Sequence, residues 1–356
     1  MAMRADVNTL MQGDLGQWLA EQTAMRAAAK ERAASRWTWG AALLMPALAF
    51  LWFGPEWGGS FRFIVTVGGL LLVGIWGYQP IAAAKKAIKV GINSAIARSY
   101  GIDYEHDVEP GPEFEAARRY GLVPSFDDSS FEDRWFGTLE GHAFNLYEAH
   151  LQEERGSGKN RRRVTVFRGV IIQMGFGRPF HSTTLLQRAG AHRKWFGLGG
   201  TKDSVSFDGH RLDYVDQVHP AFAEKFGLFS DDQVEARVLV HPSYVEHLLR
   251  LESAFGAKEL RALFSRGEVI LAVEGRDLFE SGTLNADEDR MRAEEAAEQF
   301  AALAGLALAI NQNERGRVRD EPSALAGSMP DQASATPLPD PLPVQRPAGG
   351  FGRKGL

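Results

Sequence analysis

Histidine and carboxylate side chains are the residues of this chain that could bind a metal ion or carry acid–base chemistry. The sequence has 9 histidines and no cysteine, so a metal site would need imidazole and carboxylate ligands. His142 and His150 lie eight residues apart in a strand-like run, a separation of roughly 26 Å at about 3.3 Å per residue, so they cannot share an ion. His241 and His247 are six apart, which places them on different faces of a helix. We therefore predict no metal site and no cofactor.

Motifs for nucleophilic catalysis and for phosphate binding are also missing. The chain has no GxSxG elbow and no HExxH motif. The segment Gly197–Lys202 has the composition of a phosphate loop, but its spacing is wrong, and Asp203 stands where the hydroxyl residue belongs. We predict no catalytic residue, and we keep a membrane-associated hydrolase with a scattered site as the alternative. The candidates for that scattered site are Asp127, Asp128, His181 and His241.

Two charged clusters stand out, one acidic and one basic. The acidic segment Asp127–Asp133 is interleaved with aromatic residues, and we interpret it as a solvated loop. The densest basic cluster lies at the expected tip of a hairpin and consists of Lys159, Arg161, Arg162 and Arg163. Close to a membrane, each such charge would attract anionic headgroups by about 1 kcal/mol. Cross-strand pairing with Glu153 and Glu154 is the plainer explanation.

Two uncharged runs dominate the first quarter of the chain. Trp37–Pro55 has 19 residues and Phe63–Ala84 has 22, and a helix needs about 20 apolar residues to cross a bilayer. Because only Glu56–Arg62 separates them, the two helices must return antiparallel as a transmembrane hairpin. The expected anchors at the membrane interface are Trp37, Trp39, Trp52, Trp57, Trp76 and Tyr78.

The orientation of this hairpin follows from its flanking charges. Basic residues precede the first run and follow the second, namely Arg26, Lys30, Arg32, Arg36, Lys85, Lys86 and Lys89. The turn between the runs has only Arg62, so the positive-inside rule places both termini in the cytoplasm. Neither run contains a charged residue, which favours an anchor over an ion pathway.

The rest of the chain divides by composition. Residues 1–36 predict a cytoplasmic helical lead, which either lies along the membrane surface or extends the first span; Gln22 interrupts its apolar face. Residues 37–84 form the hairpin, and residues 85–318 form a cytoplasmic α+β domain. Residues 319–356 hold seven of the 16 prolines and predict a disordered tail. A net charge of −5 argues against nucleic acid as a partner.

Hydrophobic periodicity gives the elements of the α+β domain. We expect a mixed, largely antiparallel sheet with packed helices. The predicted strands are Phe136–Leu151, Arg163–Met174, Thr183–Leu186, Ser204–Asp208, Arg211–Val215, Val234–Val240 and Glu268–Glu274. The predicted helices are Lys85–Tyr100, Glu113–Tyr120, one starting at His241–Ser243, Ala257–Phe264 and Ala286–Ile310. The first two long strands pair as a hairpin around a glycine-containing turn.

Four short motifs give the chain a family resemblance. They are Val166–Val170, Phe180–Thr184, Val238–Pro242 and Leu278–Glu280. Together with the two-span layout, they make residues 37–310 similar to a bacterial family known only as domain of unknown function three-one-three-seven. The resemblance implies a bacterial inner-membrane protein, and it implies no activity.

The leading hypothesis is a membrane-anchored cytoplasmic module that binds a protein or a lipid headgroup without catalysis. Its expected partners are the lipid bilayer and another membrane protein. Besides the hydrolase, a second alternative is an accessory subunit of a transporter or envelope complex. An anchor without charges and a domain without catalytic motifs are the two observations behind this choice.

Overall fold

The computed structural model describes most of the chain up to Asn311. The described residues are 7–54, 57–177, 179–189, 202–207, 209–216, 220–240, 244, 248, 258–275 and 278–311. They form two units: a helical unit with residues 7–92 and 281–292, and a sheet unit with residues 93–280 and 293–311. The predicted helix start at His241–Ser243 and the predicted tail of residues 319–356 lie outside the described residues.

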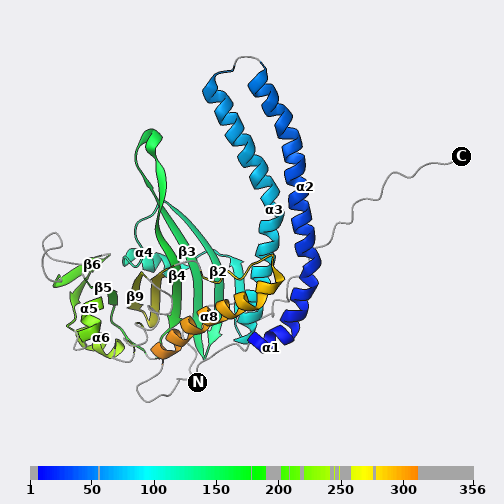
Figure 1. Ribbon diagram of the computed structural model, residues 1–356. Helices are drawn as coiled ribbons and strands as arrows, with labels where there is room; N and C mark the ends of the chain where they lie inside the picture. The colour runs from blue at the N-terminus through cyan, green and yellow to red at the C-terminus, as the bar shows by residue number, and fades with distance from the viewer. Residues whose placement is uncertain are drawn as a thin grey trace. The chain divides into compact units, whose positions relative to one another are not determined.

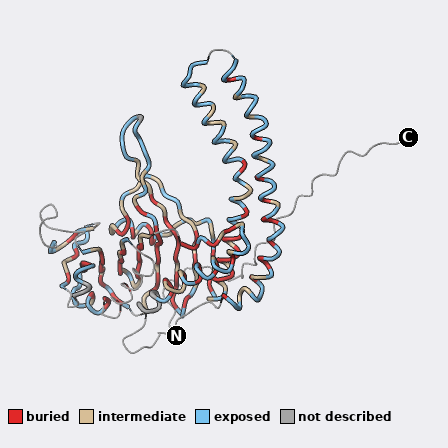
Figure 2. The backbone as a smooth tube through the Cα atoms, viewed as in Figure 1, coloured by how far each residue is buried: buried red, intermediate tan, exposed pale blue. Residues whose placement is uncertain are grey.

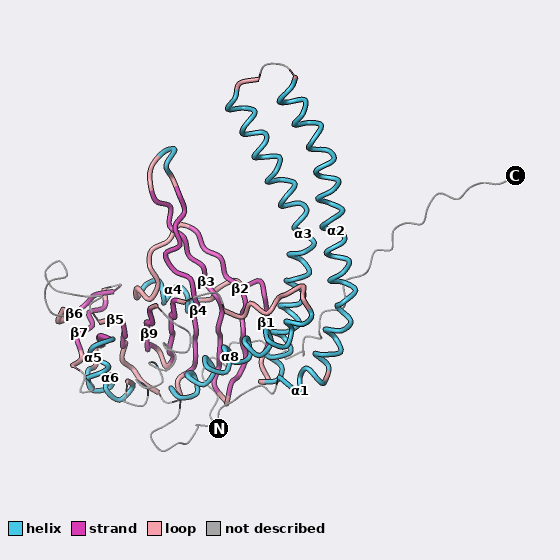
Figure 3. Tube along the Cα trace, viewed as in Figure 1, coloured by secondary structure: helices cyan, strands magenta, loops and turns pink. Residues whose placement is uncertain are grey.

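The helical unit is built from two long helices and a short one. α1 (Val7–Gln12) leads into α2 (Asp14–Phe53), and α3 (Gly59–Ser99) follows. Figure 1 and Figure 3 show α2 and α3 side by side, running in opposite directions. The two uncharged runs therefore lie in two long antiparallel helices, and a membrane crossing by both of them stays a prediction.

Close contacts hold α2 and α3 together along their length. The indole nitrogen of Trp37 donates to the carbonyl of Gly74 at 3.4 Å, and that of Trp52 donates to the hydroxyl of Thr66 at 3.1 Å. A Cβ atom at Gly77 would lie 2.0 Å from the Trp37 ring. Only glycine therefore lets the backbone of α3 approach this ring.

Among the described helices, α3 is the one long and apolar enough to cross a membrane by length and composition. Side chains in its apolar part are exposed, with Leu71 at 60% and Leu72 at 71%. In α2 the uncharged helical stretch is Trp37–Phe53, because the helix ends before Gly54 and Pro55. At about 1.5 Å per residue this stretch covers roughly 25 Å, less than the 30 Å or so of hydrocarbon.

The helical lead is buried against α3. Trp18 is 7% exposed, and a Cβ atom at Gly91 would lie 2.1 Å from its ring. Gln22, which we expected to interrupt the apolar face, is itself buried and donates to the carbonyl of Trp18 at 3.4 Å. This hydrogen bond to its own helix lets a polar amide share the buried face.

A buried ion pair joins α2 to the start of α8 (Asp289–Asn311). Nη2 of Arg26 lies 2.8 Å from both carboxylate oxygens of Asp289. The two side chains are 3% and 5% exposed. Because an unpaired buried charge is very costly, each residue requires the other for the fold.

The sheet unit contains one ten-stranded sheet in the order β1-β2-β3-β4-β10-β9-β5-β8-β7-β6. Every strand pair within the described residues is antiparallel. The strands are β1 (Asp103–Asp107), β2 (Asp128–Leu139), β3 (His142–Arg155), β4 (Arg162–Gly175), β5 (Thr184–Arg188), β6 (Ser204–Phe207), β7 (His210–Tyr214), β8 (Phe226–Ser230), β9 (Glu259–Ser265) and β10 (Glu268–Glu274). The α+β class with a large antiparallel sheet is confirmed.

Helices cover the two faces of this sheet (Figure 1). Residues 293–311 of α8 lie on one face, where Phe300 stacks on Trp135 with ring centroids 4.8 Å apart. α4 (Pro112–Arg119) lies on the other face, where Phe114 belongs to the main apolar core. Figure 2 shows the buried residues concentrated along the strands between these helices. The remaining short helices are η1 (Gly158–Asn160), α5 (Pro220–Lys225), α6 (Gln233–Leu239) and η2 (Ala286–Glu288).

Most predicted elements are confirmed to within a few residues, including the β3–β4 hairpin, β10, α4 and α8. The predicted loop over Asp127–Asp133 is wrong, because β2 begins at Asp128. The predicted single strand Phe136–Leu151 is also wrong. It is broken by a two-residue turn at Glu140 and Gly141, which have φ values of +49° and +85°. Two residues with positive φ are typical of a tight hairpin turn.

Two further elements have the opposite type from the prediction. The expected strand Val234–Val240 is α6, because the Asp232 carboxylate caps the helix by accepting from the backbone of Val234 and Glu235. The expected helix Ala257–Phe264 contains β9, which pairs with β10 along its whole length. In both places a cap or a long-range pairing outweighs the local pattern.

Removal of Arg26 tests the buried ion pair. We expect R26A to lower the free energy of unfolding by about 3–5 kcal/mol, because Asp289 remains as an unpaired buried carboxylate. The double variant R26M/D289L removes both charges and should recover much of this loss. Chemical unfolding of the full chain in detergent measures both. The control R211A removes the exposed Arg211–Asp213 pair; an R26A effect no larger than this control would contradict us.

Candidate functional site

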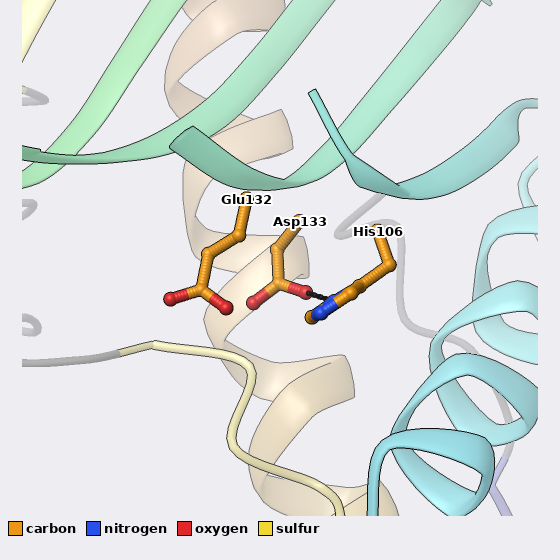
Figure 4. Close-up of side chains that lie close together, drawn as sticks. All are labelled: His106, Glu132 and Asp133. Carbon is orange, nitrogen blue, oxygen red and sulfur yellow. Dashed lines mark hydrogen bonds and ion pairs between the residues drawn. The ribbon is translucent and has the colours of Figure 1, made fainter. Parts of the chain in front are cut away.

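One group of metal-type side chains comes together in the described chain: His106 of β1 with Glu132 and Asp133 of β2 (Figure 4). One ligand atom from each lies within 4.8 Å of the others. Asp133 is fully buried, and the other two are half-buried. One imidazole and two carboxylates are a donor set that suits a divalent first-row metal ion.

A β-bulge produces this arrangement. The register between β2 and β3 shifts between Glu132 and Trp135, and Asp133 has a φ of +58°. In a regular strand, successive side chains point to opposite faces. The bulge adds a residue and turns Asp133 to the same side as Glu132, as Figure 4 shows. Aspartate is among the few residue types that tolerate this left-handed backbone.

Hydrogen bonds already use part of the Asp133 carboxylate. Its Oδ1 accepts from the Tyr104 hydroxyl at 2.5 Å and lies 3.0 Å from Nδ1 of His106. Burial, together with the charge of Asp133, raises the pKa of Tyr104 well above its ordinary value, so the phenol remains a donor. The group thus fastens the edge strand β1 to the bulge of β2. We interpret it as a hydrogen-bonded network. Its donor set is the one feature that suits a metal ion.

Local sequence patterns do not indicate this group. They predict no strand at β1, and they place Glu132 and Asp133 in a solvated loop. The acidic composition of Asp127–Asp133 is evident, but His106 lies far from this segment along the chain. Only the pairing of β1 with β2 brings the histidine to the carboxylates.

The residues named for a scattered hydrolytic site do not come together among the described residues. Asp127 accepts from the backbone of Glu154 at 2.7 Å, at one end of β2. His181 precedes β5, where its backbone donates to Glu235 at 3.0 Å. β2 and β5 are five strand spacings apart in the sheet, or about 24 Å at roughly 4.8 Å each. Asp128 pairs with Arg163, and His241 lies outside the described residues.

The basic cluster lies where the sequence placed it, at the β3–β4 hairpin tip. Arg161 and Arg163 both form ion pairs with Glu154, and Arg163 also lies 2.8 Å from Asp128. Arg162 is exposed. Lys159 falls within η1. These cross-strand pairs offset much of the positive charge, and headgroup contact by this cluster stays a prediction.

The six aromatic residues expected at a membrane interface are between 40% and 65% exposed. Near one end of the helical hairpin, the guanidinium of Arg36 lies 5.4 Å from the ring centroid of Trp76. Near the turn, the guanidinium of Arg62 lies 5.9 Å from the ring centroid of Trp52. Trp57 stacks on Phe61 at 5.1 Å. Their placement in a membrane interface stays a prediction.

His142 and His150 lie apart along one strand, as their spacing in the sequence predicted. His142 and His150 both lie in the continuous strand β3. His142 is 1% exposed, and burial lowers its pKa. His150 lies 2.9 Å from the hydroxyl of Thr165. His247 and residues 197–201 of the glycine-rich segment lie outside the described residues.

A row of polar side chains that the sequence did not reveal crosses β3, β4 and β10. Asn145 donates to Oε1 of Glu113 at 3.3 Å, and Gln173 donates to Oε2 of Glu268 at 2.7 Å. Burial raises the pKa of Glu268, although the hydrogen bond from Gln173 works against this shift. Glu113 is 5% exposed, and its charge raises the pKa of Glu268 further. A buried and a half-buried carboxyl group can serve acid–base chemistry, but here both accept structural hydrogen bonds.

With the fold and these groups described, comparison with known proteins gives one family match. Residues 165–312 match the model of a protein family of unknown function, DUF3137. The predicted resemblance is confirmed, and all four motifs quoted for it lie within the matched region. The match runs from β4 to α8, and it does not include the helical hairpin.

Other comparisons add little. A crystal structure of the mycobacterial trehalose monomycolate transport factor A, TtfA, is similar at 13% sequence identity with a TM-score of 0.31. That similarity covers 61% of this chain and 95% of the other. Among curated proteins, none matches the chain.

Substitution of Asp133 tests the network at the bulge. We expect D133A to lower the free energy of unfolding by about 2–3 kcal/mol, because the buried hydroxyl of Tyr104 loses a charged acceptor. D133N should lose less, since asparagine tolerates a positive φ and still accepts a hydrogen bond. Thermal and chemical unfolding of the full chain measure both. Equal losses for the two variants would show that the acceptor at this position contributes nothing.

Glu268 provides a test by pH. Its raised pKa means that the folded chain binds this proton more tightly than the unfolded chain, so the charged carboxylate costs stability at neutral pH. We expect E268Q to be more stable than the parent at pH 7, with the difference vanishing as the pH falls below the ordinary glutamate pKa. Unfolding curves between pH 3 and 8 or so measure this. The control E109Q, at an exposed loop residue, should show no such trend; a pH-independent difference for E268Q would contradict the assignment.

Proposed function

We propose that this chain is a membrane-anchored module whose α+β domain, facing the cytoplasm, binds a protein or a lipid headgroup without catalysis. In this proposal the apolar parts of α2 and α3 cross the membrane as a hairpin. Both termini lie in the cytoplasm, and the bacterial inner membrane is the location.

The exposed apolar surface of α3 carries this proposal. None of its most apolar window is buried. Leu70, Leu71, Leu72 and Ile75 are 57–71% exposed. An apolar surface of this kind on a long helix is unfavourable in water and favourable in lipid. The Arg36 and Arg62 contacts with tryptophan rings at the two ends support an interfacial position for those ends.

The proposal that α2 also crosses the membrane is supported by its contacts with α3. Its uncharged stretch alone is short, but the two helices share hydrogen bonds and close glycine contacts over that stretch. Leu43 and Phe53 of α2 are 72% and 91% exposed. If α3 lies in lipid, α2 must accompany it, and a short span is accommodated by thinning of the bilayer or by its flanking residues.

A binding role, as opposed to a catalytic one, is supported by how the ionisable groups are used. The His106 group and the Glu113–Glu268 row both make hydrogen bonds that connect strands. The basic hairpin tip makes cross-strand ion pairs. Within the described residues, these groups support the fold, which leaves recognition of a partner as the proposed task.

The anchor is tested by charging α3. We expect the full chain to remain with membranes after extraction at alkaline pH. L71R/I75R should release it or block insertion, because each arginine near the helix centre costs about 2.5–3.5 kcal/mol. The matched control L71A/I75A should stay in the membrane.

Reporters at the two termini complete the same experiment. Both are expected to read as cytoplasmic in cells that express the parent chain. A parent chain that stays dispersed as a compact monomer in buffer without detergent would overturn the anchor. A periplasmic signal at either end would overturn the orientation.

A further inference from the structure

A cleft of about 640 Å³ opens on the sheet unit, on the side covered by α4. Volumes of 300–1,000 Å³ or so are typical of small-molecule sites. Its lining residues are Arg118, Arg119, Gly121, Val123, Pro124, Ser125, Phe126, Gln187, Phe207 and Arg261. Three of these are arginines, and none is acidic. The cleft belongs to none of the groups described above.

Arg261 of β9 is held in place at the cleft. Its Nη1 donates to the carbonyl of Leu122 at 2.7 Å, and its Nη2 pairs with Glu259. The side chain is 18% exposed. A guanidinium has five N–H donors in a rigid fork, so these contacts fix the plane and leave donors for a ligand. Partial burial also strengthens its interaction with an anion.

Gln187 of β5 is a second polar group at the cleft. The residue is 4% exposed and lines the cleft. Its Nε2 would lie 3.9 Å from a Cβ atom at Gly121, which also lines the cleft. A glutamine amide offers two N–H donors and a carbonyl acceptor, so at the cleft wall this side chain can hydrogen-bond a bound molecule.

Arg118 and Arg119 come from the last turn of α4, where the helix dipole favours basic residues in any protein. Arg118 pairs with Glu115 at 2.7 Å, but both side chains are more than half exposed. Such exposed pairs are weak, and a bound anion can replace them. What distinguishes this cleft is that Arg261 and Gln187, from two other elements, converge on the same place.

The rest of the cleft wall is apolar and contains Val123, Pro124, Phe126 and Phe207. Gly121 lies between the two parts of the wall with a φ of +67°, and a Cβ atom there would lie 3.1 Å from the Phe207 ring. Glycine thus keeps the aromatic wall beside the arginines. An anion alone would not use this wall, whereas an anion attached to an apolar or aromatic group would.

We propose that this cleft binds a phosphate ester, with the three arginines and Gln187 around the phosphate and the attached group against Phe126 and Phe207. Arginine forks match the oxygens of a phosphate in a bidentate manner. Two sources offer this chemistry: the headgroup of an anionic lipid and a soluble nucleotide. The proposal does not depend on the membrane anchor.

Calorimetry on the full chain in maltoside detergent, which does not require a membrane-spanning anchor, tests the proposal. The probes are adenosine monophosphate against adenosine, and glycerol 3-phosphate against glycerol. We expect the phosphorylated member of at least one pair to bind about tenfold or more tightly than its partner, as hydrogen bonds to a charged group imply. Tighter binding of the nucleotide assigns a soluble source, and tighter binding of glycerol 3-phosphate assigns a headgroup. If neither phosphate improves binding, the proposal is wrong.

Variants tie the binding to the cleft. R261K keeps the charge but loses the fork, and R118Q/R119Q removes two exposed charges with little risk to folding. Each should weaken phosphate binding about tenfold or more. R211Q, which removes an exposed arginine of β7 outside the cleft, is the matched control and should bind like the parent. If R261K fails to fold, R118Q/R119Q alone decides. Phosphate binding that survives R118Q/R119Q, or that falls equally in R211Q, overturns the proposal.

Discussion

The pairing of β3 with β4 is the constraint on which the sheet unit depends. Their register runs from Phe144 and Met174 to Arg155 and Arg162, with one irregularity near Leu151. β2 and β1 extend the sheet on one side of this hairpin, and β10 and β9 extend it on the other. Because side chains alternate along paired strands, this register decides which residues meet α4 and which meet α8. The His106 group lies on β1 and β2, on one side of this central pair in the strand order. The arginine cleft draws on β9 and β5, on the other side.

The sequence predicted the elements in which the local pattern and the long-range pairing agree. Glu268–Glu274 is a continuous apolar run between two glutamates, is rich in β-branched residues, and has the predicted bounds. The predictions are wrong where a helix cap or a long-range strand pairing outweighs the local hydrophobic pattern. Asp232 caps α6 although Val234–Val240 alternates like a strand. β9 has the composition of a helix, but a tight turn with positive φ at Arg266 and Gly267 returns the chain onto β10. Neither capping geometry nor strand partners can be read from periodicity alone.

The candidate sites were harder to predict than the fold for a related reason. Asp133 reaches Glu132 and His106 only because a bulge turns its side chain, and a bulge has no clear sequence signature. Arg119 of α4 and Arg261 of β9 line the same cleft although more than a hundred residues separate them in the sequence. Charged runs are easy to recognise in the sequence, as at the basic hairpin tip, where the arginines form ion pairs with carboxylates. The single arginines of the cleft cannot be recognised in the same way, because their role depends on residues that only the fold brings next to them.

Anchoring and weak recognition fit together energetically. A cleft with a few arginines and one amide, open to solvent, is suited to modest affinity, since Arg261 and Arg118 already pair with Glu259 and Glu115. A tethered module does not need high affinity, because attachment to a bilayer raises its effective concentration towards anything else at that surface. The proposed anchor also explains why α3 keeps an exposed apolar face that a freely soluble protein would bury. An exposed apolar helix and an anion-binding cleft of modest affinity are compatible in one chain, because attachment to a bilayer raises the effective concentration of ligands at that surface and so offsets the modest affinity.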